Sequence, residues 1–157
     1  MAEFPITPEG IERLKSELAQ LKNVERHKIS KEIGAARELG DLSENFEYHA
    51  AKDRQGLVEA KIRDLEDKLS RAKVIDPKKL TGDRVVFGAT VQLTDIESGE
   101  EKTYQIVGEY EGNLDLGRIS VTSPVARALI GKETGDEVKV PGKGGPRLVE
   151  ISSVEFK

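Results

Sequence analysis

Two acidic side chains in the N-terminal half have the type and spacing to do chemistry. Asp41 and Glu44 lie in a short segment, from Gly40 to Asn45, that interrupts two long helical patterns. Carboxylates three residues apart converge on one point when the turn between them is helical or tight. Magnesium prefers oxygen ligands and is rarely caged by one or two carboxylates alone. The pair therefore indicates oxygen ligands delivered to a metal site that another molecule already holds.

The same spacing also has a purely structural explanation. Asp41 would cap the helix that follows the turn, and Glu44 would complete an arrangement similar to a capping box. A negative charge at that position also interacts favourably with the helix dipole. Spacing alone leaves both explanations open and favours the cap.

The other polar candidates near the turn carry weaker signals. Single histidines on amphipathic helices, such as His27 and His49, are mostly packed or solvated rather than catalytic. Arg37 before the turn, and Lys52 and Arg54 after it, could attract a phosphate backbone, although ordinary surface charge is the favoured explanation. The chain has no Cys, which excludes disulfides and thiolate zinc sites, so any metal must be held by oxygen.

Two helices must position the turn. Thr7 and Pro8 form a start signal, because a capping hydroxyl precedes a proline at the first helical position. Apolar residues then recur at steps of three and four on both sides of the turn, and the second pattern ends before Pro77. They are Ile11, Leu14, Leu18, Leu21, Ile29, Ile33 and Ala36, followed by Val58, Ile62, Leu65, Leu69 and Ala72. One short turn requires antiparallel helices, and arms of roughly 30 residues would each extend about 45 Å.

The C-terminal half changes to short β-type runs. These runs cover residues 84–87, 90–94, 103–107, 118–121, 137–140 and 148–154. The segments 95–100 and 141–146 have the composition of hairpin connections. Ser123, Pro124 and a stop at Gly131 predict one short helix. The predicted fold class is α+β, with a coiled-coil helical hairpin in residues 1–76 and a small β-sheet domain in residues 77–157.

Composition limits the classes of function. Charged residues make up 34% and aromatics 4%, which suits long solvated helices better than one large aromatic core. Residues 1–76 contain 14 basic and 16 acidic residues, and the remainder contains 11 and 13. Neither half is basic, so tight autonomous binding of nucleic acid is not expected. The sequence shows neither a signal peptide nor a membrane-length apolar stretch, so we expect a cytoplasmic protein with no membrane partner.

The residues around the turn, 36–51, closely resemble the Gre family of bacterial transcript cleavage factors. The similarity extends along the chain through residues 6–10, 74–76 and 119–132. It implies an N-terminal coiled-coil hairpin and a C-terminal FKBP-like β-sheet domain with one short helix. Two positions depart from the family pattern. Phe46 stands where a smaller residue is common, and Ser43 stands where a charged residue often occurs.

The resemblance implies an accessory factor, not an enzyme, that binds bacterial RNA polymerase. The C-terminal domain would dock at the rim of the secondary channel while the hairpin reaches the active centre. Asp41 and Glu44 would then help hold the second Mg²⁺ ion in trans, shared with the polymerase and not bound by the free protein. The polymerase would cut the 3′ end of backtracked nascent RNA and rescue arrested complexes. On this basis metal delivery becomes the favoured role of the pair.

Other residues take roles only through the resemblance. Arg37 and Lys52 match a basic patch that contacts the displaced RNA end, and Ser123 and Pro124 match a segment associated with polymerase docking. The expected partners are RNA polymerase and the nascent RNA 3′ end, with the factor itself a monomer.

Two further classes of function remain open at the level of sequence. A binding-only regulator would plug the channel and inhibit synthesis by occupying it. A prolyl isomerase or chaperone would use the FKBP-like part, although that half has only four aromatic residues to line a proline pocket. They are Phe87, Tyr104, Tyr110 and Phe156.

Overall fold

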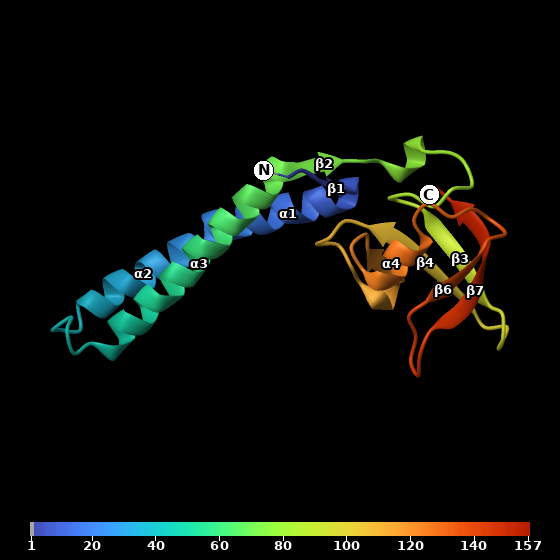
Figure 1. The fold of residues 1–157 in the computed structure, drawn as a ribbon. Coiled ribbons are helices and arrows are strands. Elements are labelled where there is room, and N and C mark those ends of the chain that lie inside the picture. The colour runs from blue at the N-terminus through green and yellow to red at the C-terminus, as the bar shows by residue number, and fades with distance from the viewer. Residues whose placement is uncertain (1) are drawn as a thin grey trace. The chain divides into compact units, whose positions relative to one another are not determined.

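The computed structural model describes residues 2–157, which form two compact units (Figure 1). Residues 11–71 form the helical unit, and residues 72–157 together with the chain up to Gly10 form the sheet unit. The sequence predicts a single boundary after Asp76. In the structure, residues 2–10 and 72–76 instead belong to the sheet unit. No helix within residues 2–157 is long and apolar enough to cross a membrane.

The elements confirm the predicted α+β class, with a helical hairpin and a sheet domain that carries one short helix. The α-helices are α1 (Pro8–Gln20), α2 (Arg26–Arg37), α3 (Phe46–Arg71) and α4 (Pro124–Leu129), with a π-helical segment η1 (Leu21–Glu25) and 3-10 turns η2 (Pro77–Lys79) and η3 (Leu114–Leu116). The strands are β1 (Phe4–Ile6), β2 (Ala72–Val74), β3 (Thr90–Asp95), β4 (Glu101–Val107), β5 (Arg118–Ser120), β6 (Glu137–Val140) and β7 (Arg147–Glu155).

The first helical arm starts as predicted and then contains a π-helical turn. The Thr7 hydroxyl oxygen accepts a hydrogen bond from the Gly10 N–H at 3.1 Å, and Pro8 is the first helical residue. Ile33 is buried on this arm, and so is a series of residues at longer steps, Leu14, Leu21, Ile29 and Ala36. Their spacing is seven, eight and seven residues, so one extra residue falls between Leu21 and Ile29. The wider turn of η1 takes up that residue and keeps the apolar seam on one side.

Helices α2 and α3 run side by side as an antiparallel pair, joined by the short turn (Figure 1). Ala51, Ile62 and Leu65 are the buried residues of α3. Ion pairs also cross between the helices. Arg26 donates two hydrogen bonds to Glu59, both at 2.9 Å. Such exposed pairs add little stability. They form only when α2 and α3 are in the register seen here.

A five-stranded sheet in the order β5-β4-β3-β7-β6 forms the larger part of the sheet unit. The two predicted hairpin connections are confirmed, because β3 pairs antiparallel with β4 and β6 pairs antiparallel with β7. β4 and β5 are parallel, and α4 contacts β6 and β5. The core cluster consists of Val85, Ala89, Val91, Leu93, Ile106, Ile119, Ala126, Leu129, Val138, Val140, Val149 and Ile151.

The predicted strand at residues 84–87 is wrong. The N–H of Val85 donates to the Lys132 carbonyl at 2.7 Å, and its carbonyl accepts from the Gly131 N–H at 2.8 Å. This backbone therefore pairs with the loop after α4, while the fully buried Val85 side chain supplies the apolar signal. The sequence also gave no sign of β1 and β2, which pair in parallel with Phe4 opposite Ala72. Ala72 is thus a strand residue and not the end of a helix.

A buried carboxylate ties the first residues of the chain to the sheet unit. Glu111 is 4% exposed and accepts hydrogen bonds from the Thr7 N–H at 3.0 Å and from the Gly108 N–H at 2.7 Å. The Thr7 hydroxyl also donates to it. A Cβ atom on Gly10 would overlap the Glu111 carboxylate, so the helix start needs a glycine there. These contacts hold Thr7, the residue directly before α1, against Glu111 of the sheet unit.

Candidate functional site

The turn between α2 and α3 is an exposed loop of residues 38–45. The first two amides after α2 donate to carbonyls of its last turn, which ends the helix cleanly. Gly40 follows with a φ of 129°, a conformation that side chains with a Cβ rarely adopt. The glycine therefore lets the chain reverse directly in front of Asp41.

Asp41 is held in the loop by Ser43. The backbone N–H and the hydroxyl of Ser43 donate to Oδ1 of Asp41 at 2.9 and 2.8 Å. Hydrogen bonds to the charged form stabilise it, so first the backbone bond and then the hydroxyl bond lower the pKa of Asp41 below its ordinary value. Neither bond uses Oδ2. The carboxylate is thus oriented and ionised at neutral pH.

Glu44 lines the same hollow as Asp41. Both exposed carboxylates line one open hollow of about 380 Å³, together with Leu39, Asn45, Phe46 and Glu47. The geometry therefore brings the two predicted residues to one place at the end of the hairpin. Within residues 2–157, no three His, Asp or Glu side chains form a group that could hold a metal ion.

The alternative that Asp41 caps the second helix is wrong, because Asn45 does so. The Asn45 side-chain oxygen accepts from the Tyr48 N–H at 3.0 Å, three residues into the start of α3. Its side-chain amide donates back to the Ala36 carbonyl at the end of α2. Asn45 therefore joins both helix ends, a role that the sequence analysis missed although Asn is among the preferred capping residues. Asp41 and Glu44 are not needed for the cap.

Apolar side chains are exposed around the acidic pair. Leu39 is 66% exposed, Leu42 is 40% exposed and Phe46 is 84% exposed. A second open hollow is lined by Leu39 and Phe46 and continues along α2 and α3, where alanines of both helices line it together with the charged residues Glu32, Glu47 and Arg54. The turn thus presents acidic oxygens and an apolar surface together.

The two predicted basic residues lie at the same end of the hairpin. Arg37 is the last residue of α2, and its guanidinium lies 5.9 Å from the centre of the Tyr48 ring. The Lys52 ammonium donates to the side chain of Gln55 at 3.0 Å, and both basic residues are exposed. His49 contacts the Tyr48 ring edge-on, with ring centres 5.5 Å apart. His27 is exposed on α2.

Ser123 and Pro124 lie in the sheet unit at the start of α4. The Ser123 hydroxyl accepts from the Ala126 N–H at 3.3 Å, and Pro124 is the first helical residue. Their geometry confirms the predicted cap and first-position proline. Pro124 is exposed, whereas Ser123 is half-buried.

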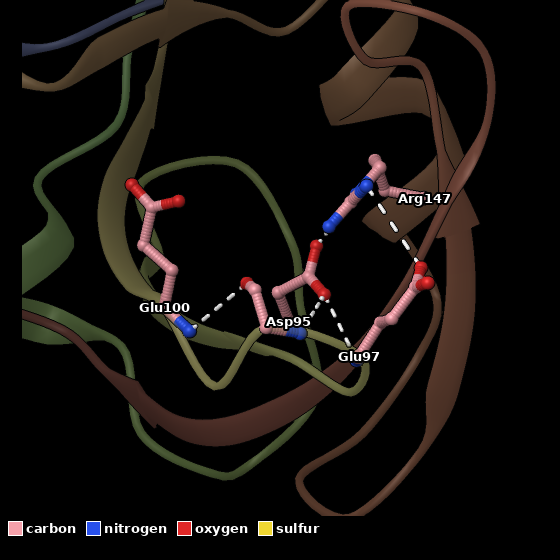
Figure 2. Close-up of polar contacts among 5 residues, drawn as sticks. Asp95, Glu97, Glu100 and Arg147 are labelled. Carbon is pink, nitrogen blue, oxygen red and sulfur yellow. Dashed lines mark hydrogen bonds and ion pairs between the residues drawn. The ribbon is translucent and has the colours of Figure 1, made fainter.

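The sheet unit has its own hollow, of about 340 Å³, whose rim carries a charged network (Figure 2). Arg147 Nε donates to Asp95 Oδ2 at 2.8 Å, and the N–H groups of Glu97 and Ser98 donate to Oδ1, both at 2.9 Å. The Arg147 bond is the main cause that lowers the pKa of Asp95 to about 2. Tyr104 is the one aromatic among the described residues that line this hollow. A proline pocket with several aromatic walls is therefore not formed by these residues.

Comparisons with known proteins cover nearly the whole chain. Residues 4–74 match the family model described as transcription elongation factor, N-terminal, and residues 80–156 match transcription elongation factor, GreA/GreB, C-term. The chain is 55% identical over 156 residues to transcription elongation factor GreA of Phenylobacterium zucineum, covering 99% of each protein. It is 57% identical over 156 residues to the protein of the same name from an Anaeromyxobacter species, covering 99% of this chain and 94% of the relative.

A comparison with solved structures gives the GreA factor homolog 1 protein of Thermus thermophilus. The two chains are 31% identical, with 98% of this chain and 99% of the other covered, at a TM-score of 0.44.

Proposed function

Because the chain belongs to the GreA/GreB family of transcription elongation factors, we propose that it stimulates RNA cleavage by RNA polymerase. The hairpin enters the secondary channel of the polymerase and carries its turn to the active centre. The polymerase cuts the 3′ end of a backtracked transcript and leaves a new 3′ hydroxyl for extension. The protein acts as a monomeric, cytoplasmic accessory factor and not as an enzyme, since the polymerase supplies the main catalytic groups.

The exposed acidic pair is the observation that carries this proposal. Asp41 and Glu44 line one open hollow at the end of two packed helices. Their carboxylates are a minority of the six oxygen ligands that Mg²⁺ needs, which suits an ion whose other ligands belong to the polymerase. A second metal ion in such a site stabilises the attacking and leaving oxygens of a phosphoryl transfer. The role of this chain is to supply carboxylate oxygens in a fixed orientation, and the two hydrogen bonds from Ser43 fix that of Asp41.

The remaining candidate residues fit the same proposal. Arg37 and Lys52 are exposed cations at the hairpin end, where they contact phosphates of the displaced RNA. Ser123 and Pro124 start α4 in the sheet unit, which docks on the polymerase. These contacts position the factor and the RNA and leave the carboxylates as the groups next to the reaction.

The direct test replaces Asp41 with Asn and Glu44 with Gln, singly and together, in stalled and backtracked elongation complexes. Each change keeps the shape of the side chain but removes its charge, so we expect stimulated cleavage to fall by more than about tenfold. Affinity for the polymerase should stay the same, because neither residue belongs to the docking segment. Glu38→Gln is the matched control, since Glu38 is an exposed carboxylate of the same loop outside the hollow.

Two results would oppose the proposal. Full stimulation by the double variant would remove the assigned role of the carboxylates. Inhibited extension by the unaltered protein, without shortened transcripts that can be extended again, would instead identify a regulator that only plugs the channel.

A further inference from the structure

Phe46 at the hairpin turn has no structural reason for its size. It is the first residue of α3 and is 84% exposed. The nearby core cluster of Ile29, Ile33 and Ala51, with Tyr48 and Val58 packed against it, does not include it. Aromatic residues are weaker helix formers than Ala, so the helix does not favour Phe at this position either. The ring is therefore available to a partner.

The ring lies where two hollows meet. Phe46 lines the acidic hollow with Asp41 and Glu44, and it also lines the hollow along the hairpin flank. Leu39 is the other apolar residue that borders both. A molecule in contact with this ring is thus next to Asp41 and Glu44 on one side and next to a mixed surface of alanines and charged side chains on the other.

The charge around the ring selects what can contact it. Asp41, Glu44 and Glu47 line the acidic hollow, so they repel any phosphate that approaches without a metal ion between the charges. A nucleobase is neutral and planar, and it stacks favourably on an exposed aromatic face. Bases of a single strand are free to do so, whereas those of a duplex are already stacked. The combination of an acidic hollow and a bare ring fits the base of an unpaired nucleotide.

We propose that Phe46 stacks on a nucleobase of the displaced RNA 3′ segment and thereby holds the scissile phosphate beside Asp41 and Glu44. This inference rests on the proposed function, because it takes the RNA end as the molecule that reaches the acidic pair. Phe46 is then a positioning residue for cleavage. Stacking tolerates every base but strengthens with ring size, so a purine at the contacting position gives faster cleavage than a pyrimidine.

The test compares Phe46→Ala, Phe46→Leu and Phe46→Trp in reconstituted backtracked complexes, with the rate measured as a function of factor concentration. We expect the rate at saturating factor to fall about tenfold for Ala and for Leu and to be retained for Trp. The half-saturating concentration should not change. Circular dichroism checks folding, which these changes at an 84% exposed position should leave intact.

A second measurement identifies the RNA as the partner. Single abasic nucleotides are placed in turn along the 3′ segment of the transcript. At one position the missing base should slow cleavage with the unaltered protein and have no further effect with Phe46→Ala, because the stacking partner is already absent.

Three outcomes would overturn the inference. They are an unchanged rate for Phe46→Ala, full activity for Phe46→Leu, or a loss that appears only as a raised half-saturating concentration. The last two would identify an apolar contact with polymerase protein. In each case Asp41→Asn would still lower stimulated cleavage by more than about tenfold, whereas failure of the proposed function itself would show as normal cleavage by the Asp41 and Glu44 double variant.

Discussion

At the scale of single residues, Asp41 and Asp95 are two carboxylates held by hydrogen bonds in different settings. Asp41 is oriented by Ser43 but keeps Oδ2 outside both bonds, which suits a ligand. Asp95 accepts from Arg147 and from two backbone amides, which fixes the turn between β3 and β4. Hydrogen bonds lower the pKa of both groups. A lowered pKa therefore does not by itself distinguish a functional carboxylate from a structural one.

The Asp95 network predicts a specific response to acid. The folded-state pKa of Asp95 is about 2, below its value in the unfolded chain. Its contribution to stability is thus complete above about pH 4 and is lost as the pH falls toward about 2. Arg147→Met removes the main cause, so the pKa of Asp95 should rise toward its ordinary value, as measured by NMR titration of the carboxyl carbon.

The same variant should show a weaker dependence of its unfolding free energy on pH in that window. Denaturant unfolding at about pH 5 and about pH 2 provides this comparison, with Asp95→Asn as the control that cannot titrate. An unchanged pKa of Asp95 in Arg147→Met would show that the backbone amides alone hold it low.

At the scale of elements, helical periodicity carried most of the prediction. The two arms, the cap at Thr7 and the start of α4 follow from local patterns, and the structure confirms each of them. The strand predicted at residues 84–87 failed because a buried β-branched residue gives the same local signal in a loop. The π-helical turn was not predicted, although the eight-residue step from Leu21 to Ile29 is visible in the sequence. Local patterns report burial better than they report hydrogen-bond partners.

Two helical glycines provide a matched prediction about these elements. Gly34 lies in α2, where an added Cβ meets nothing within 4 Å, so Gly34→Ala should raise the unfolding free energy by about 0.5–1 kcal/mol. Gly10 lies in α1, where the same Cβ overlaps the buried Glu111 carboxylate. Gly10→Ala should therefore lower stability by about 1–3 kcal/mol. Denaturant unfolding of both variants measures the difference.

A stabilising effect of Gly10→Ala would contradict the buried contact between α1 and Glu111.

At the scale of the whole molecule, the contacts that sequence reasoning could not find are the long-range ones. Glu111 accepts a hydrogen bond from Thr7, more than a hundred positions away in the sequence. β1 pairs with β2, although the whole helical hairpin lies between them in the sequence. A single acidic residue or a three-residue strand has no periodicity to detect. The acidic turn was found because Asp41 and Glu44 are close in sequence, whereas their arrangement depends on Ser43, Asn45 and Gly40. The roles in RNA cleavage that we propose rest on family resemblance and not on spacing.

Two variants of Ser123 separate a direct contact with the polymerase from an effect on the folding of α4. Ser123→Ala removes the cap and should cost about 1 kcal/mol of stability, whereas Ser123→Asn keeps a capping oxygen. If the Ser123 surface contacts the polymerase, both variants should bind it more weakly at a temperature where both are folded. Full affinity of Ser123→Asn, measured in a direct binding assay, would limit the residue to its structural role.

The most direct measurement of the central claim is the magnesium dependence of cleavage in a defined backtracked complex. Cleavage is followed across a magnesium titration without the factor, with the unaltered protein, and with the Asp41→Asn, Glu44→Gln double variant. We predict that the unaltered protein lowers the magnesium concentration needed for half-maximal cleavage, while the double variant binds the polymerase but leaves that concentration where it is without the factor. An equal shift by both proteins would contradict the claim that the two carboxylates help to hold the metal.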